Sequence, residues 1–218
     1  MKKRLGEKYK AVIFDLDGTL INSLPYHVLS FKDLLLERGV RVDDNYLKKL
    51  IGLPTEVILK ELEHKYRIKE NIHNLREERR YHYFKFLGKR DITFPGVKKF
   101  LGELRLDYKL AVATGSSKVI LIHSTDKDFQ GLFDVVVTIN EVKKGKPSPE
   151  QLFLAVKRLK VKKQECLFIG DSIYDAIASK AAGIDFIGVT TGYIQSKEFK
   201  ENSVIKVLSS VKELKKIL

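Results

Sequence analysis

The amino-acid sequence predicts an α/β fold, in which a doubly wound, mainly parallel sheet receives an inserted all-helical segment. Three observations lead to this fold class. Short and almost wholly apolar runs recur along the chain, amphipathic helical patterns lie between most of them, and one long stretch carries helical patterns alone. Strand and helix patterns that alternate in this way are typical of parallel sheets with helices on both faces.

The apolar runs supply the predicted strands. They lack the polar alternation of a sheet with one wet face, so both faces of each strand should be covered. In chain order they span residues 9–15, 108–114, 134–138, 165–171, 185–190 and 204–208.

Helical patterns divide the chain into two parts. Apolar residues three and four apart predict helices between the later strands, over 97–106, 149–159 and 172–182. The long stretch after the first strand holds four more, over 26–38, 44–50, 55–66 and 72–87. Thr55 is the expected N-cap of the third of these four. We therefore predict a core domain of residues 1–21 and 91–218, with an all-helical domain of residues 22–90 inserted into it.

Composition excludes several classes of protein. The chain has 218 residues, of which 44% are hydrophobic and 32% charged, so it can bury a core and global disorder is excluded. Its apolar runs fall short of the ~20 residues that cross a bilayer, and no membrane partner is expected. Because Cys166 is the one cysteine, no disulfide can form within the chain, and a cytoplasmic location is expected.

The charge of the chain is strongly basic. Lys and Arg number 41 against 28 Asp and Glu, which gives +13. Such a balance favours anionic partners, and nucleic acid and a phosphorylated small molecule are the candidates. The basic residues are spread over several segments, without a zinc-finger or aromatic ribonucleoprotein-type motif. We therefore favour a solvated Lys-rich surface and expect no specific nucleic acid partner.

The strongest chemical signal is Asp15-Leu16-Asp17-Gly18-Thr19-Leu20, at the end of the first predicted strand. Residues two apart in extended chain point to the same side, so Asp15 and Asp17 can converge at the strand's carboxyl end, where open α/β sheets bind ligands. Two neighbouring carboxylates repel unless one is protonated or a cation lies between them. An ordinary Asp-Gly turn is the alternative interpretation.

A second acidic pair consists of Asp171 and Asp175, at the end of the run 165–171. The two lie one helical turn apart, so both carboxylates can face one cavity. Alternatively, Asp171 or Ser172 caps the helix that follows, and capping is compatible with metal binding.

Two further loops could bind phosphate. Thr114 ends the run 108–114 and Gly115 follows it. Hydroxyl and backbone N–H groups there suit a phosphate oxygen, although such loops are also ordinary turns. Lys146 precedes Pro147, which keeps it in extended backbone before a helix that starts near Pro149. Most lysines in so basic a chain are solvated. Doubly wound topology can nevertheless bring all four loops to one sheet edge, which makes coincidence a poor explanation.

With these four motifs in this order, the chain resembles the haloacid dehalogenase-like superfamily of phosphohydrolases. The first motif holds Asp15 and Asp17, the second Thr114, the third Lys146, and the fourth Asp171 with Asp175. The resemblance implies a Rossmann-like core and makes residues 22–90 a helical cap that selects the substrate. Within the cap region, Pro25, His27 and Ile51-Gly52-Leu53-Pro54 are similar to phosphoglycolate phosphatase-like members and their β-phosphoglucomutase relatives.

The resemblance implies a Mg²⁺-dependent phosphatase of small phosphorylated metabolites that works through an aspartyl-phosphate. Asp15 would be the nucleophile and Asp17 the general acid and base. Thr114, Gly115 and Lys146 would bind the phosphoryl group. Asp15, the backbone carbonyl of Asp17, and Asp171 would bind Mg²⁺, while Asp175 would orient a metal-bound water or Lys146. The basic residues of the cap that could contact the leaving group are Lys48, Lys49, Arg76, Arg79, Arg80 and Lys85.

Other functions stay open at this point. A phosphohexomutase of the same family would use these residues to move a phosphoryl group within a sugar, and an inorganic pyrophosphatase would use them on pyrophosphate. A nucleic-acid-binding protein would use the basic surface, and a catalytically dead scaffold would keep only the fold. The acids and the lysine that follow the apolar strands favour the phosphatase. The oligomeric state, monomer or dimer, stays open as well.

Overall fold

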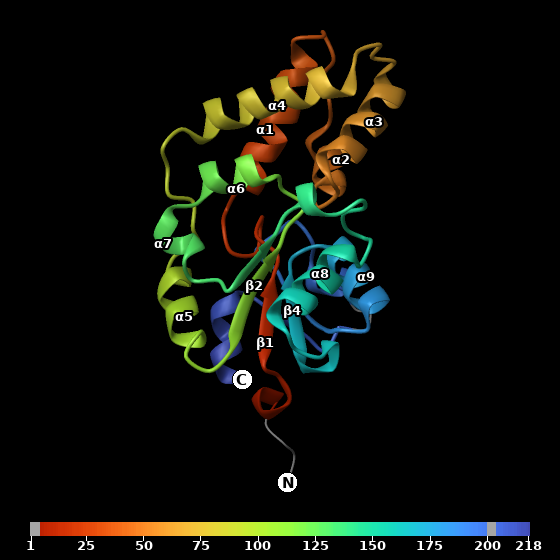
Figure 1. Ribbon diagram of the computed structural model, residues 1–218. Helices are drawn as coiled ribbons and strands as arrows, with labels where there is room; N and C mark the ends of the chain where they lie inside the picture. The colour runs from red at the N-terminus through yellow and green to blue at the C-terminus, as the bar shows by residue number, and fades with distance from the viewer. Residues whose placement is uncertain (1–4, 200–203) are drawn as a thin grey trace.

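A six-stranded, wholly parallel sheet in the order β3-β2-β1-β4-β5-β6 forms the centre of the molecule (Figure 1). The computed structural model describes residues 5–199 and 204–218. The strands are β1 (Ala11–Phe14), β2 (Lys109–Ala113), β3 (Val135–Val137), β4 (Cys166–Gly170), β5 (Asp185–Val189) and β6 (Lys206–Leu208). Each lies within one of the predicted runs, so the α/β fold class is confirmed.

Helices cover both faces of the sheet, which explains why its central strands are apolar throughout. Val12 and Phe14 of β1 face one layer, formed by α5 (Val97–Leu104), α6 (Lys118–Ser124), α7 (Lys127–Gln130) and the C-terminal 3-10 helix Val211–Lys216. Ala11 and Ile13 face the other layer, formed by α8 (Glu150–Leu159), α9 (Ile173–Ala182) and α10 (Ser196–Phe199). Successive residues of one strand thus pack into opposite layers. Further 3-10 turns are Leu5–Lys8, Ile139–Glu141 and Lys163–Glu165.

Between β1 and β2, the first four of five helices form the inserted segment, and α5 follows them. The four are α1 (Leu24–Leu36), α2 (Asp44–Leu50), α3 (Thr55–Tyr66) and α4 (Ile72–Leu87). The last three have the predicted bounds. The prediction that Thr55 is the N-cap of α3 is wrong, because Thr55 is the first helical residue and Pro54 precedes it in extended backbone with ψ of 140°. The backbone changes from extended to helical one residue earlier than the cap pattern suggested.

The inserted helices have a hydrophobic core of their own. Val28 and Phe31 of α1 pack there against Leu47 of α2, Ile58 of α3 and Leu75 of α4. Figure 1 shows this layer beyond the carboxyl ends of the strands. The C-terminal part of α4 belongs to the neighbouring core, because Tyr83 and Leu87 pack into the cluster on the α5 face of the sheet. The insert therefore covers the sheet edge at which the predicted motifs end.

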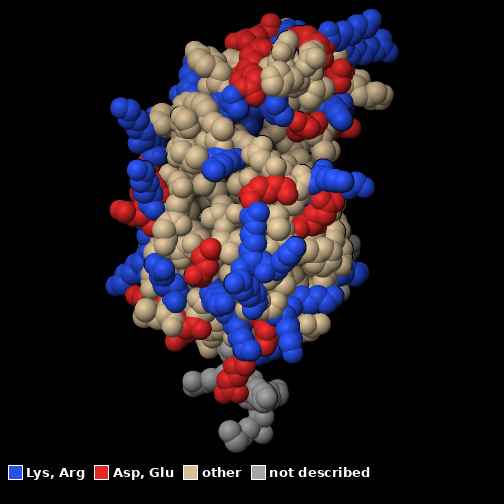
Figure 2. All heavy atoms as spheres, viewed as in Figure 1, with Lys and Arg blue, Asp and Glu red and all other residues tan. Residues whose placement is uncertain are grey.

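Charged side chains of both signs cover the face seen in Figure 2. Lys and Arg are densest in its lower half, over the sheet, and Asp and Glu lie among them. Some charges of the protein are paired; for example, Arg38, which follows α1, lies 2.7 Å from both Glu70 and Glu78. Within residues 5–199 and 204–218, no helix has the length and apolar content that crossing a membrane requires.

We predict that truncation of Leu101 destabilises the fold far more than truncation of the nearby Leu106. Leu101 is fully buried on α5, whereas Leu106 is 82% exposed. Leu101→Ala should lower the free energy of unfolding by about 2–5 kcal/mol, because it removes buried methyl groups and leaves a cavity. Leu106→Ala should change it by less than about 0.5 kcal/mol. Urea denaturation of both variants measures the difference, and equal losses would contradict the packing described.

Candidate active site

The carboxyl ends of two adjacent strands bring three buried acids together. Asp15 follows β1 and Asp171 follows β4, and the two strands pair in parallel, with Phe14 opposite Ile169. The Asp15 amide continues this ladder by donating to the Ile169 carbonyl over 2.8 Å. Asp175 is reached one turn into α9. One carboxylate oxygen from each of Asp15, Asp171 and Asp175 lies within 4.8 Å of the other two.

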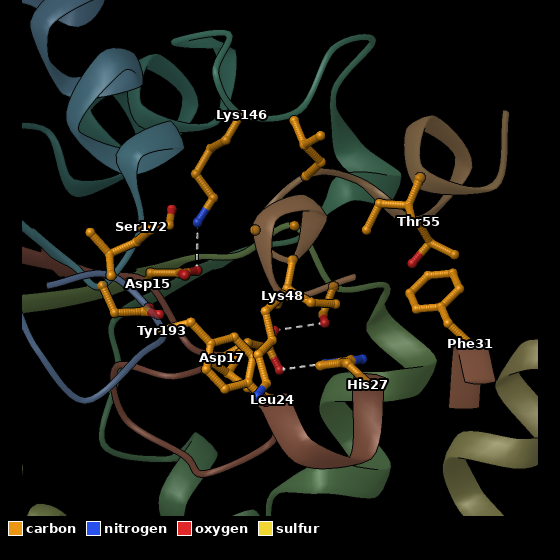
Figure 3. Close-up of a pocket in the computed structure, with 18 of the residues that line it drawn as sticks. Asp15, Asp17, Leu24, His27, Phe31, Lys48, Thr55, Lys146, Ser172 and Tyr193 are labelled. Carbon is orange, nitrogen blue, oxygen red and sulfur yellow. Dashed lines mark hydrogen bonds and ion pairs between the residues drawn. The ribbon is translucent and has the colours of Figure 1, made fainter. Parts of the chain in front are cut away.

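A buried lysine lies between two of these acids. Lys146 Nζ is 2.6 Å from an oxygen of Asp15 and 2.6 Å from an oxygen of Asp175, and the lysine is only 2% exposed (Figure 3). Burial disfavours the ammonium ion, but the two carboxylates outweigh burial and raise the pKa of Lys146 above its ordinary value. Lys146 is therefore a permanent cation in the site.

Burial and mutual repulsion weaken the acidity of Asp15 and Asp171. Burial raises the pKa of Asp15 to about 7, with Lys146 opposing the rise and Asp175 adding to it. Burial, then the charges of Asp15 and Asp175, hold the pKa of Asp171 well above its usual range. When all three acids are ionised, three negative charges face one ammonium ion. The cluster then has a net charge of −2, which favours a divalent cation.

The acidic cluster fits Mg²⁺ in its chemistry and in its space. Asp15 Oδ1 is buried and lies 2.6 Å from Lys146 Nζ, but among the described residues it accepts no aligned hydrogen bond. One oxygen of Asp171 accepts a hydrogen bond from Thr19 Oγ1 at 2.7 Å, and the other lies where a Cβ at Gly18 or Gly192 would overlap it. Carboxylate oxygens are the protein ligands that Mg²⁺ prefers. Asp15 and Asp171 could therefore hold a magnesium ion.

Asp17 has the opposite environment, because four donors surround its carboxylate. Oδ1 accepts from Ser23 Oγ at 2.6 Å and lies 3.0 Å from His27 Nε2. Oδ2 accepts from Ser116 Oγ at 2.7 Å and from Thr114 Oγ1 at 3.2 Å. Burial alone would raise the pKa of Asp17, but His27 and the two serine hydroxyls outweigh burial and hold the pKa well below its usual range.

Local sequence explains how these donors reach Asp17. Gly18 has a φ of +79°, which side-chain-bearing residues rarely adopt, so the chain can turn sharply after Asp17. The turn leads directly into α1, where Ser23 precedes the helix and His27 follows four residues later. From the other side, Thr114 and Ser116 follow β2, which pairs with β1. The Thr114 carbonyl is held in turn by Gln151, whose Nε2 donates to it over 2.5 Å.

A pocket between the sheet and the inserted helices joins these groups. From the sheet side it is lined by Asp15, Asp17, Gly115, Lys146 and Asp171. The insert contributes Lys48, Gly52, Leu53, Ile58 and Arg79, and Lys48 extends across the pocket in Figure 3. The two sides touch, because the Tyr174 hydroxyl donates to the Lys49 carbonyl over 3.0 Å. The insert thus closes one side of a site whose acids and Lys146 come from the sheet side, and it adds the cations Lys48 and Arg79.

All seven residues singled out in the motifs lie in or directly behind this pocket. Two of them lie behind the pocket lining: Thr114 donates a hydrogen bond to Asp17, and Asp175 accepts one from Lys146. Of the basic residues of the insert, Lys48 and Arg79 line the pocket, and Arg76 and Arg80 line an adjoining groove. The sequence reasoning did not identify Ser23, Thr19 or Tyr193. The four-residue spacing of Ser23 and His27, directly after the first motif, was the available signal for two of the donors to Asp17.

Comparison with known proteins agrees with this arrangement. The profile of the haloacid dehalogenase-like hydrolase family matches residues 12–189. The chain is 28% identical to a phosphorylated carbohydrates phosphatase of Thermotoga maritima, over 91% of this chain and 94% of that protein. It is also 28% identical to a phosphoglycolate phosphatase of Nitrosospira multiformis, over 96% of this chain and 95% of that protein.

Solved structures have the same fold. A crystal structure from Bacteroides fragilis, described as a haloacid dehalogenase-like hydrolase, superimposes with a TM-score of 0.81 at 28% identity. That match covers 95% of this chain and all of the other. A β-phosphoglucomutase of Clostridium difficile gives the same TM-score at 24% identity, over 94% of this chain and 93% of that one, and shows likeness of fold.

We predict that Asp171→Asn stabilises the metal-free protein. The change removes one of three mutually repelling charges while keeping an oxygen for the Thr19 hydroxyl. At about pH 8, with a chelator present, Asp171→Asn should raise the free energy of unfolding by roughly 1 kcal/mol. For a chain of this size, this corresponds to a rise of about 2–4 °C in Tm. Mg²⁺ should raise the Tm of the wild type, and that of the variant by much less. The exposed Asp107→Asn is the control and should behave like the wild type in both conditions.

The stability of the metal-free wild-type protein should also depend on pH. Asp15 binds its proton more tightly when folded, with a pKa of about 7, than when unfolded. The unfolded state therefore holds fewer protons near this pH, and the stability of the metal-free wild type should fall as pH rises from about 6 to about 8. A Tm that rises over this interval, or that Mg²⁺ leaves unchanged, would contradict the charge balance described.

Proposed function

The chain belongs to the haloacid dehalogenase-like hydrolase family, and we propose that it removes the phosphoryl group of phosphoglycolate-like acids or sugar phosphates through an aspartyl-phosphate on Asp15. As a family member it is a phosphoric monoester hydrolase that acts on small phosphorylated metabolites. One observation carries the finer proposal. Asp15 and Asp17, two residues apart, line one pocket in different environments: Asp15 lies beside Lys146 and Asp171, whereas Asp17 lies among hydroxyl donors, so the two carboxyl groups can take different roles.

Asp15 acts as the nucleophile in the first step. One of its carboxylate oxygens forms a bond to phosphorus while the bond from phosphorus to the ester oxygen breaks. The leaving oxygen takes a proton from Asp17 and departs as an alcohol. The approach of a carboxylate to a phosphate dianion is opposed by charge, and the Lys146 ammonium beside Asp15 offsets part of that repulsion.

Asp17 acts as the base in the second step. A water gives its proton to Asp17 while the water oxygen bonds to phosphorus, and the bond between phosphorus and Asp15 breaks. Inorganic phosphate leaves and the Asp15 carboxylate is restored. The low pKa of Asp17 keeps its carboxylate ionised and able to accept a proton, but only weakly basic. For the acid role, we infer that Thr114 and Ser116 turn their hydroxyls to the incoming phosphoryl oxygens, which removes two donors from Asp17 and raises its proton affinity.

We propose Mg²⁺ as the cofactor. The carboxylates of Asp15 and Asp171 and the backbone carbonyl of Asp17 would hold it. When bound, it would neutralise charge on the phosphoryl group and on the acids around it. Asp175 keeps Lys146 in place, since it also accepts hydrogen bonds from the Ser172 amide and hydroxyl, at 3.0 and 2.6 Å, and is thereby fixed at the start of α9.

The inserted helices would select the substrate. We propose that residues 22–90 form a cap domain on a core of residues 1–21 and 91–218, and that the cap shields the reacting groups from water. Support comes from the separate hydrophobic core of α1–α4 and from the insert residues that line the pocket. Similar proteins named for phosphorylated carbohydrates, phosphoglycolate and fructose 1-phosphate suggest the panel of esters to test.

Asp15→Asn should abolish turnover without unfolding the protein. An amide cannot act as the nucleophile, so kcat should fall by roughly 10³-fold or more. Asp128→Asn, an exposed acid on α7, is the matched control and should keep full activity. Acid quenching with radiolabelled substrate should trap phosphate on the wild type and none on the variant. Full turnover by Asp15→Asn, with reversion to Asp excluded by mass spectrometry, would remove Asp15 from the nucleophile role.

The deciding experiment measures phosphate release from phosphoglycolate, fructose 1-phosphate, glucose 1-phosphate and pyrophosphate, with Mg²⁺ and with chelator. We expect phosphate from one or more of the organic esters, loss of activity in chelator and recovery on adding Mg²⁺. Product analysis of glucose 1-phosphate separates the alternatives, because a mutase returns an isomeric sugar phosphate. Undiminished hydrolysis after exhaustive chelation would refute the metal proposal. Hydrolysis of pyrophosphate alone would show that the protein is a pyrophosphatase and that the organic esters are not its substrates.

A further inference from the structure

Arg79 of α4 is a buried cation whose role the proposed chemistry does not yet include. It is 1% exposed, and its guanidinium carbon lies 4.7 Å from the ring centre of Phe31 and 5.3 Å from that of Tyr83. A buried arginine usually pairs with a carboxylate, because an uncompensated charge is costly to bury. Among the residues that the structure describes, no carboxylate forms a direct ion pair with Arg79. The positive charge of Arg79 is instead stabilised by the two aromatic rings and by the hydrogen bonds described next.

The hydrogen bonds of Arg79 lead to Asp17 through one intermediate side chain. Arg79 Nε donates to Ser30 Oγ over 2.9 Å, and Nη2 contacts Nδ1 of His27. The opposite nitrogen of the same ring, His27 Nε2, lies 3.0 Å from Asp17 Oδ1. The imidazole is held flat against Tyr83, with 4.5 Å between ring centres. A buried row thus runs from a cation of the insert to a carboxylate of the sheet domain.

The chemistry of a guanidinium group determines where the proton of His27 lies. Arginine has five donors and no acceptor, so Nδ1 of His27 must accept from it through its lone pair. The proton of the neutral ring is then on Nε2, where it points at the Asp17 carboxylate. If Arg79 were absent, the ring could carry its proton on Nδ1 instead. The lone pair of Nε2 would then face a negatively charged oxygen and repel it.

We propose that Arg79 is a positioning residue for Asp17, which it orients by fixing the tautomer of His27. The proposal rests on the acid–base role of Asp17 proposed above. With His27 and Ser23 holding Oδ1, the other oxygen of Asp17 remains available to the hydroxyls of Thr114 and Ser116, and to the reacting groups. The cap helix α4 thereby acts on proton transfer without contact to the reacting atoms.

A leaving-group comparison tests this role. Loss of proton donation slows departure of an alkoxide, whereas p-nitrophenolate is stable enough to leave without a proton. In Arg79→Met, kcat/KM for the best alkyl phosphate should fall by roughly 10–100-fold, and that for p-nitrophenyl phosphate by less than about threefold. Because kcat/KM reports phosphoryl transfer to Asp15, the comparison isolates the step in which Asp17 acts as the acid.

Further variants test whether the selective fall in kcat/KM comes from a general loss of positive charge or of packing. Arg90→Met removes an exposed cation just after α4, which donates to the Phe86 carbonyl, and it should leave both substrates unaffected. Arg79→Lys keeps a cation with one donor nitrogen and should restore part of the lost rate. His27→Ala should show the same leaving-group selectivity, and the double variant of His27→Ala and Arg79→Met should lose no more than the worse single variant. The His27 variant carries the test if Arg79→Met does not fold.

The remaining outcomes overturn the proposal. Equal losses on both substrates would show that Arg79 is only structural. A rise in KM with unchanged kcat, growing with the negative charge of the leaving group, would make Arg79 a direct substrate ligand. Additive losses in the double variant would separate Arg79 from His27. If the wild-type enzyme hydrolysed neither ester, the proposed function itself would fail, which is distinct from a selective loss in a variant of an active enzyme.

Discussion

Repulsion between buried carboxylates at the ends of two neighbouring strands is the constraint around which the site is built. Parallel pairing of β1 with β4 fixes Asp15 beside Asp171, and the start of α9 adds Asp175. One lysine compensates part of this charge. A fold does not gather such groups for its own stability, since replacing them by apolar residues would cost less. The cluster is better explained by function, as a site that binds charged groups.

Asp15 and Asp17 show how two identical side chains acquire different properties. Their backbone positions differ by only two residues, yet one is among acids and the other among hydrogen-bond donors. The sharp turn at Gly18 produces this difference, because it sends the chain directly into α1 and so brings Ser23 and His27 to Asp17. The division of chemical roles therefore follows from local backbone geometry as much as from the sheet.

Sequence patterns predicted much of the fold and the acids of the site, for physical reasons that also set their limits. Buried parallel strands are apolar on both faces, so their runs stand out, and polar residues at their ends mark the ligand-binding edge. The order of the strands depends on contacts between distant segments, which periodicity does not contain. Ser23 shows the same limit: a serine before a helix normally caps it, but here its hydroxyl donates to Asp17 and leaves the helix uncapped. Arg79 was one of several basic residues of the insert, and only tertiary packing distinguishes it from its exposed neighbours.

The way α4 ends has a consequence for chimeric enzymes. Tyr83 and Leu87 belong to the inserted segment by sequence but fill the hydrophobic layer on the α5 face of the sheet. Exchanging residues 22–90 for the corresponding segment of a relative would therefore also exchange two pieces of the recipient's interior. A chimera that keeps the second half of α4 from the recipient protein retains this part of its hydrophobic core. The exchanged helices could then change substrate specificity without disturbing the sheet domain.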